Sequence, residues 1–167
     1  MNVSLLPMGA VPPELLARLS RRLAGYGVSV AMLPRAEVPL EALDARRHRY
    51  RAEALLPRGT ENVLAVTTAD LYTEGYDFIL GLANAGSGGA VVSVHRLSAP
   101  DPGLVLDRLV KESAHELGHT WGLAHCDDGV CVMRFSNSLA ETDAKGARFC
   151  RSCEASLPDG VASPPIR

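Results

Sequence analysis

The segment from Asp101 to Gly122 constrains the fold of this chain more than any other part of the sequence. Asp101 and Pro102 are typical of a helix start, and the helical pattern then continues until Gly122. Apolar residues recur at helical spacing along one face, and His115 and His119 lie roughly opposite that face. The sequence therefore predicts a long helix that presents two imidazoles to a cleft rather than to the core.

The histidines of this helix have the spacing of metal ligands. His115 and His119 are about one helical turn apart, so their rings can share one metal ion. Glu116 is turned about 100° around the helix from His115, where a carboxylate reaches the water of a metal rather than the metal itself. Gly122 can adopt a positive φ and end the helix, so that the chain turns back and supplies His125 as a third ligand. The pattern predicts a zinc site with its general base, and the alternative is a set of solvated helix histidines.

Four cysteines follow the third histidine. Cys126 and Cys131 form a C-x4-C pair, and Cys150 and Cys153 form a C-x2-C pair. Such pairs predict a tetrahedral zinc site, with an iron or iron–sulfur centre, disulfides or free thiols as alternatives. A site with four thiolates is coordinatively closed, so it would stabilise the fold without taking part in chemistry. The adjacent residues His125 and Cys126 would then bind two different metals.

The rest of the chain alternates between strand and helix patterns, which predicts a mostly parallel sheet. Strands are expected at residues 2–8, 26–33, 62–72 and 90–97, the last at an edge, and helices at residues 12–25 and 41–56. Residues 75–89 indicate a loop-rich passage, and residues 158–167 a poorly ordered terminus.

Composition excludes several classes of protein. The 167 residues suit one domain, and a formal net charge of −2 does not favour bulk binding to nucleic acid or to acidic membranes. Neither a signal peptide nor a membrane span is evident, so the expected location is the cytoplasm. The arginines around His48 indicate a solvated surface, with nucleic-acid contact as the alternative, and His95 indicates a surface or rim residue, with substrate contact as the alternative.

The run HExxHxxGxxHC, followed by x4-C-x-M and a later C-x-x-C, resembles the archaemetzincins, a family of metzincin zinc peptidases. The resemblance rests on His115, Glu116, His119, Gly122, His125, Cys126, Cys131, Met133, Cys150 and Cys153. It implies an α+β, metzincin-like fold: a twisted, mostly parallel sheet with an antiparallel edge strand, helices, and a small zinc-stapled C-terminal subdomain. Met133 would occupy the Met-turn, an apolar floor beneath the catalytic zinc.

The resemblance also implies one catalytic domain over residues 1–167, with an upper subdomain (1–122), a lower subdomain (123–160) and a tail (161–167). The expected function is zinc-dependent hydrolysis of peptide bonds, in which Glu116 takes a proton from a zinc-activated water. Two zinc ions per chain, one catalytic and one structural, a peptide or protein substrate, and a monomeric state are expected. The alternatives are a non-catalytic zinc-structured module that binds peptides or proteins, and a hydrolase of a non-peptide amide.

Substrate contacts are expected near the edge strand. A peptide could add to residues 90–97 as a further strand, with residues 84–89 as a flexible rim. No tyrosine follows Met133 in the sequence, so the oxyanion would be stabilised by zinc alone or by backbone donors.

Overall fold

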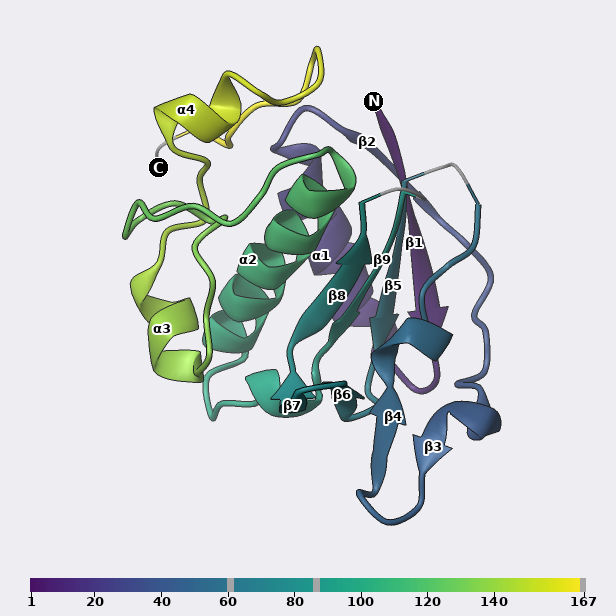
Figure 1. Cartoon of the computed structure of the whole chain (residues 1–167). Coiled ribbons are helices and arrows are strands. Elements are labelled where there is room, and N and C mark those ends of the chain that lie inside the picture. The colour runs from purple at the N-terminus through teal and green to yellow at the C-terminus, as the bar shows by residue number, and fades with distance from the viewer. Residues whose placement is uncertain (60–61, 86–87, 166–167) are drawn as a thin grey trace.

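The computed structural model describes residues 1–59, 62–85 and 88–165. The helices, 3-10 turns (η) and strands in this part of the chain are, in order, β1 (Asn2–Met8), α1 (Pro13–Ala24), β2 (Ser29–Met32), η1 (Leu40–Ala42), β3 (Leu43–Asp44), β4 (Arg49–Arg51), η2 (Ala52–Ala54), β5 (Val63–Thr67), β6 (Leu71–Thr73), β7 (Tyr76–Ile79), β8 (Gly81–Asn84), β9 (Gly89–Ser93), η3 (His95–Leu97), α2 (Pro102–Thr120), α3 (Leu139–Ala144) and α4 (Arg151–Glu154). Figure 1 shows their arrangement in space. No helix among these residues is long and apolar enough to cross a bilayer.

A five-stranded sheet in the order β2-β1-β5-β9-β8 forms the centre of the molecule. Neighbouring strands are parallel from β2 to β9, and β8 is antiparallel to β9, with Leu82 opposite Val91. A smaller sheet has the order β3-β4-β6-β7. The predicted mostly parallel sheet with one antiparallel edge strand is therefore confirmed.

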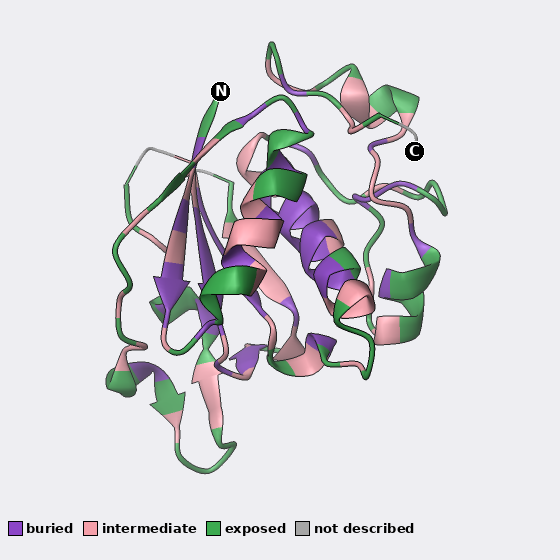
Figure 2. Cartoon of the chain, turned by 180° about the vertical axis from the view of Figure 1, so that it is seen from behind, coloured by how far each residue is buried: buried purple, intermediate pink, exposed green. Residues whose placement is uncertain are grey.

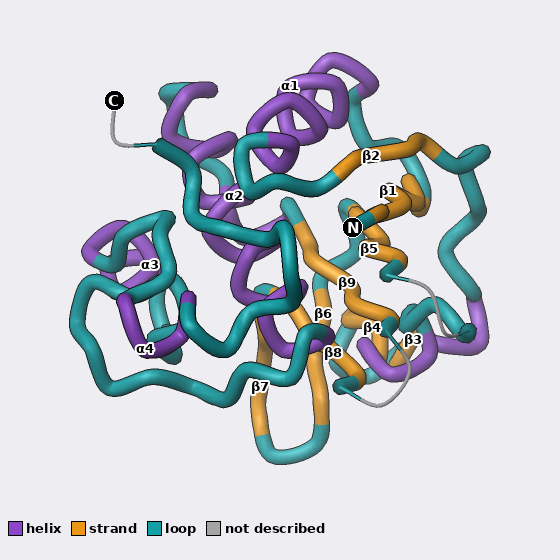
Figure 3. Tube along the Cα trace, turned by 90° about the horizontal axis from the view of Figure 1, so that it is seen from above, coloured by secondary structure: helices purple, strands orange, loops and turns teal. Residues whose placement is uncertain are grey.

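Both long helices cover the same face of the large sheet. α2 packs against β8 and β9, and α1 packs against α2 and β2 (Figures 1 and 3). Successive side chains of a strand point to opposite faces, so Val92 belongs to the core beneath the helices. Its neighbour Val91 belongs to a second core with Leu55 and Leu71, on the opposite face. α2 is buried along most of its length, as Figure 2 shows, because protein surrounds it on nearly all sides.

The predicted helix at residues 41–56 is wrong. The segment forms η1, β3, β4 and η2 instead. The carboxylate of Asp44 accepts hydrogen bonds from the N–H groups of Arg46 and Arg47 at 2.9 and 3.1 Å, which closes a turn. His48 then has φ +52°, outside the helical region. This local side-chain bonding overrides the helix propensity of the flanking residues.

The predicted position of the edge strand is also wrong. β9 lies between β5 and β8, and all five of its residues are buried. Its continuous apolar run is the pattern of a strand covered on both faces. The strand at this edge of the sheet is β8, and β2 lies at the other edge. β8 falls within the passage expected to be loop-rich, which also contains β7. Of the rim expected at residues 84–89, residues 86–87 lie outside the described part of the chain.

The expected disorder of the C-terminal tail is wrong for residues 158–165. Val161 is buried, and the N–H of Ala162 donates to the carbonyl of Tyr26 at 3.0 Å. The hydroxyl of Ser163 accepts from the N–H of Phe149 at 3.0 Å. These contacts hold the tail against the end of α1, whereas residues 166–167 lie outside the described residues.

Candidate active site

The two ends of α2 have the signals that the sequence predicts. Asp101 caps the helix, since its carboxylate accepts a hydrogen bond from the N–H of Gly103 at 2.8 Å, and Pro102 occupies the first position. At the other end Gly122 has φ +92°, a left-handed conformation that favours glycine. The chain reverses there and returns toward the last turns of the helix.

The structure brings His115, His119 and His125 together. Each ring offers one nitrogen, and these nitrogens all lie within 4.8 Å of one another. Nε2 of His115 lies 3.1 Å from Nε2 of His119. The Nδ1 atoms of the same rings lie 2.9 Å from the carbonyl of Val132 and 2.8 Å from that of Leu123. Nδ1 therefore carries the hydrogen, and Nε2 keeps a free lone pair.

This donor set fits a zinc ion. Two imidazole lone pairs that face each other repel unless a cation lies between them, and a backbone acceptor on the other ring nitrogen is the usual support of a metal-binding histidine. Burial, followed by the charge of Lys145, lowers the pKa of His115 to about 3. Burial also lowers the pKa of His119 and that of His125. The imidazoles are therefore neutral near pH 7, which is the form that binds zinc.

Glu116 is buried and lines the same cleft as the three histidines. The cleft has a volume of about 490 Å³, and its other walls come from β7, β8 and residues 135–137. Burial raises the pKa of Glu116 well above its usual range, and the neighbouring carboxylate of Glu112 raises it further. A carboxylate with a raised pKa beside a metal-binding cluster is a candidate general base.

Gly81, at the start of the edge strand β8, lies directly against this carboxylate. A Cβ atom at position 81 would lie 2.6 Å from Oε1 and 2.7 Å from Cγ of Glu116. The absence of a side chain at Gly81 therefore provides the space that Glu116 occupies.

Met133 packs against the turn of α2 that carries the two helical histidines. The residue is fully buried, and a Cβ atom on Gly118 would lie 2.4 Å from its Sδ atom. Its carbonyl accepts a hydrogen bond from the N–H of Cys126 at 3.0 Å. Met133 thus supplies an apolar contact next to the histidine cluster and is bonded to the segment that carries His125.

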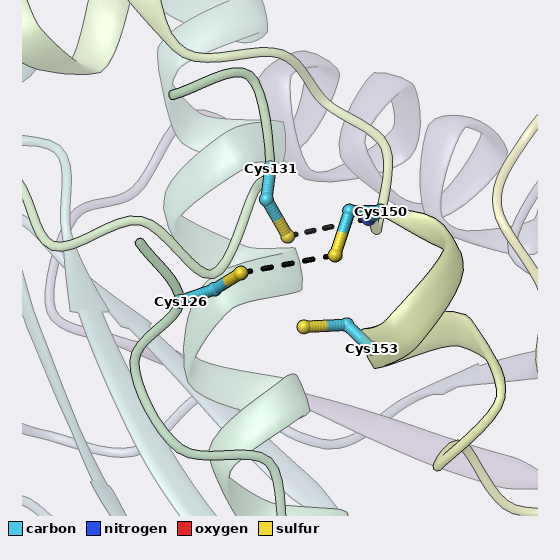
Figure 4. A group of neighbouring side chains, drawn as sticks. All are labelled: Cys126, Cys131, Cys150 and Cys153. Atoms are coloured by element: carbon cyan, nitrogen blue, oxygen red, sulfur yellow. Dashed lines mark hydrogen bonds between the residues drawn. The ribbon is translucent and has the colours of Figure 1, made fainter. Parts of the chain in front are cut away.

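The four cysteines also converge, as Figure 4 shows. Their Sγ atoms all lie within 4.8 Å of one another, and none is in a disulfide. Sγ of Cys126 lies 3.7 Å from that of Cys150, and the N–H of Cys150 donates to Sγ of Cys131 at 3.3 Å. Hydrogen bonds from the Ser152 hydroxyl and then from the N–H of Cys153 lower the pKa of Cys150 to about 6. The cluster fits a tetrahedral metal site rather than a pair of disulfides.

Glu112 and Lys145, which no sequence pattern pointed to, form a buried ion pair beside the cleft. Nζ of Lys145 lies 3.1 Å from Oε1 of Glu112, and the Lys145 side chain is fully buried. Glu112 itself lines the cleft, one helical turn before Glu116. Two signals could have indicated the pair: the i, i+4 spacing of the two glutamates, and the fact that Lys145 is one of only two lysines in the sequence.

Other residues of interest stay apart from the histidine cluster. Nε2 of His95 lies 3.9 Å from the carboxylate of Asp70, and His48 lies in the turn between β3 and β4. Neither is among the described residues that line the cleft. Among the described residues that line the cleft, Tyr76 is the only tyrosine, and it precedes α2 in the sequence.

Comparison with known proteins agrees with this geometry. The family model for Peptidase family M54 matches residues 9–159. The archaemetzincin of Methanopyrus kandleri is 50% identical over 125 residues, which cover 71% of each chain. A crystal structure of the archaemetzincin of Archaeoglobus fulgidus, complexed with malonate, aligns with a TM-score of 0.89 and 36% identity, covering 94% of this chain and 100% of that one. A zinc-dependent peptidase of Methanocorpusculum labreanum aligns with a TM-score of 0.84 and 32% identity over 93% of this chain and 100% of the other.

Proposed function

The chain belongs to peptidase family M54 and is a zinc metallopeptidase, and we propose that its three-histidine cluster binds the catalytic zinc while Glu116 acts as the general base. One observation carries this assignment. Three neutral imidazoles offer nitrogens within 4.8 Å of one another, and they share a cleft with a buried carboxylate. A purely structural zinc site has no use for such a carboxylate and leaves no ligand position open.

The residues of the chain divide the reaction between them. His115, His119 and His125 would hold the zinc ion, which when bound would lower the pKa of water and polarise the substrate carbonyl. Glu116 accepts the proton of the attacking water and then delivers it to the leaving amine. Its burial supports this role, because a raised pKa brings the carboxylate closer to the proton affinity that such a transfer needs near neutral pH.

We place the substrate along β8 rather than along β9. Among the described residues β8 is the last strand of the large sheet, so a further strand could add beside it. Gly81, Leu82 and Ala83 of this strand line the cleft. A peptide that pairs with β8 would lie beside Glu116, which contacts Gly81 at the start of the strand.

We assign the four cysteines to a second, structural zinc. Four thiolates complete a tetrahedral shell and leave no position for substrate. The ligands come from the segment that follows His125 and from the region around α4, so the metal would join these two parts of the C-terminal segment. Two zinc ions per chain are therefore proposed.

Gly81→Ala should reduce kcat/KM by about 10- to 100-fold, because the added methyl group displaces the Glu116 carboxylate and small misplacements of catalytic groups are costly. Zinc content should stay unchanged, since the three atoms nearest to a Cβ atom at position 81 all belong to Glu116 rather than to a histidine. Steady-state kinetics and metal analysis of the purified variant would check this. Gly129→Ala is the matched control, because its Cβ would meet only a side-chain nitrogen of Arg134, at 3.6 Å. Equal kcat/KM in the two variants would contradict the positioning of Glu116 by Gly81.

The proposed function is tested with the zinc-loaded protein and a mixed peptide library. We expect new peptide termini that a chelator suppresses and that added zinc restores. Products that resist the chelator would contradict zinc chemistry. Tight binding of peptides without turnover would favour a non-catalytic module that binds peptides. Cleavage of non-peptide amides, but not of peptides, would favour a hydrolase of non-peptide amides.

A further inference from the structure

The buried pair formed by Glu112 and Lys145 joins three parts of the molecule. Glu112 lies in α2, and its Oε1 atom accepts hydrogen bonds from Nζ of Lys145 at 3.1 Å and from the hydroxyl of Thr142 at 3.2 Å. Thr142 lies in α3, and Lys145 is the residue that ends this helix. Nζ of Lys145 also donates to the carbonyl of Arg134 at 3.2 Å. One ammonium group therefore ties α3 and the segment after Met133 to α2.

The segment that Lys145 holds is a wall of the cleft. Arg134 is followed by Phe135, Ser136 and Asn137, all of which line the cleft. The ring of Phe135 packs on the ring of His125, with centroids 4.9 Å apart, and makes an edge-to-face contact with the ring of Tyr76 at 6.3 Å. The place of this wall relative to α2 thus decides the shape of the space that a substrate meets next to the histidines.

A buried ion pair is suited to setting position rather than stability. Removal of two charges from water is costly, and apolar replacements of both partners are often neutral or stabilising. The loss of one partner leaves a buried charge without compensation, so arrangements in which the two groups separate are strongly disfavoured. The side chain of Lys145 is fully buried and that of Glu112 is 5% exposed, so water screens the attraction between the two charges only weakly.

We infer that Glu112 and Lys145 are positioning residues that fix the wall at residues 135–137 against α2 and thereby set the affinity for substrate. The inference rests on the proposed function, because the affinity in question is that for the peptide substrate. The role proposed for the pair is to hold the wall in place, and it requires neither metal binding nor proton transfer by Glu112 or Lys145.

The chain offers a matched control in a second ion pair between the same two helices. Arg108 in α2 donates through Nε and Nη2 to the carboxylate of Asp143 in α3, at 2.7 Å each. Its Nη1 atom donates to the carbonyls of Leu97 and Ser98, upstream of α2. Loss of this pair should therefore loosen α3 without releasing the wall.

The test compares Lys145→Met with Arg108→Met in the zinc-loaded protein. For Lys145→Met we expect KM for a cleaved peptide to rise about tenfold while kcat stays within about threefold, because uniform binding is lost but the chemistry is not. Amide hydrogen exchange at residues 135–137 should become about tenfold faster. Arg108→Met should change neither quantity, and zinc content should be unchanged in both variants.

An effect of Lys145→Met on protein stability must be distinguished from an effect on the position of the wall. The double variant Glu112→Met/Lys145→Met removes both charges of the pair and leaves neither partner unpaired, so its unfolding midpoint should return toward that of the wild type while KM and exchange stay raised. Recovery of KM together with stability would overturn the inference, as would equal effects in Lys145→Met and Arg108→Met. If the wild type cleaves no peptide, the proposed function fails, and exchange at residues 135–137 still decides whether the pair holds the wall.

Discussion

Glu116→Gln should abolish nearly all peptide cleavage while the protein keeps its metal. Glutamine has nearly the same shape as glutamate but cannot accept the proton of the attacking water. A general base contributes about 10²- to 10⁴-fold to a rate, so kcat/KM should fall by that factor. The other described carboxylate that is both buried and at the cleft, that of Glu112, is paired with Lys145, so we do not expect it to replace Glu116 as the base. Kinetics with a peptide substrate and zinc analysis of the same preparation would measure both quantities.

Glu74→Gln is the control for this variant. Glu74 is exposed in the turn between β6 and β7, near the cleft, so its change tests the loss of one negative charge without the loss of a base. We expect kcat/KM of Glu74→Gln to stay within about twofold of the wild type, as is usual for a surface substitution. Activity of Glu116→Gln within tenfold of the wild type would remove Glu116 from the role of base.

The second large effect is expected at Cys126. Cys126→Ser removes one ligand of the proposed structural zinc, and structural zinc sites contribute about 10–16 kcal/mol of binding free energy to folding. Cys126 also follows His125 directly, and its N–H holds the carbonyl of Met133. We therefore expect a lower unfolding midpoint and an affinity of the histidine site for zinc that is about 10- to 100-fold weaker, the usual effect of losing a residue that supports a ligand. Thermal unfolding and competition with a zinc indicator would measure the two effects.

Cys153→Ser separates the two causes of such a loss. Cys153 is a ligand of the same proposed site but lies in α4, far from His125 in the sequence. If both variants weaken the histidine site, the structural zinc itself supports the third histidine. A weaker histidine site in Cys126→Ser alone would assign the effect to the local backbone, and unchanged affinity in both would show that the two sites are independent.

The elements that the sequence predicts well are those with a long pattern and local boundaries. β1 and α1 have a clear period, and α2 has in addition a capping aspartate and a terminating Gly122. The wrong predictions concern short elements. Residues 41–56 have a composition typical of a helix, but the hydrogen bonds to Asp44 form a turn there instead. β8 has only four residues, too few for an alternating strand pattern to be distinguished from a loop.

The residues of the candidate site also differ in how well the sequence predicts them. The histidines and cysteines were predictable because their spacing alone brings each pair within reach of one metal. Glu112 and Lys145 were not, because 32 positions separate them and only the packing of α3 against α2 brings them together. Gly81 was missed for a similar reason, since its role is to leave space for a side chain in another element.

The contact between the tail and α1 has a consequence for the order of folding. The hydrogen bond from Ala162 to Tyr26 closes a loop that contains most of the chain, whereas the four cysteines lie between residues 126 and 153. Contacts at large sequence separation carry a greater entropic cost before they form, and they slow folding. The cysteine region can therefore gather its sulfurs through local contacts first. We expect its docking onto the end of α1, through contacts of large sequence separation, to follow at a late stage of folding.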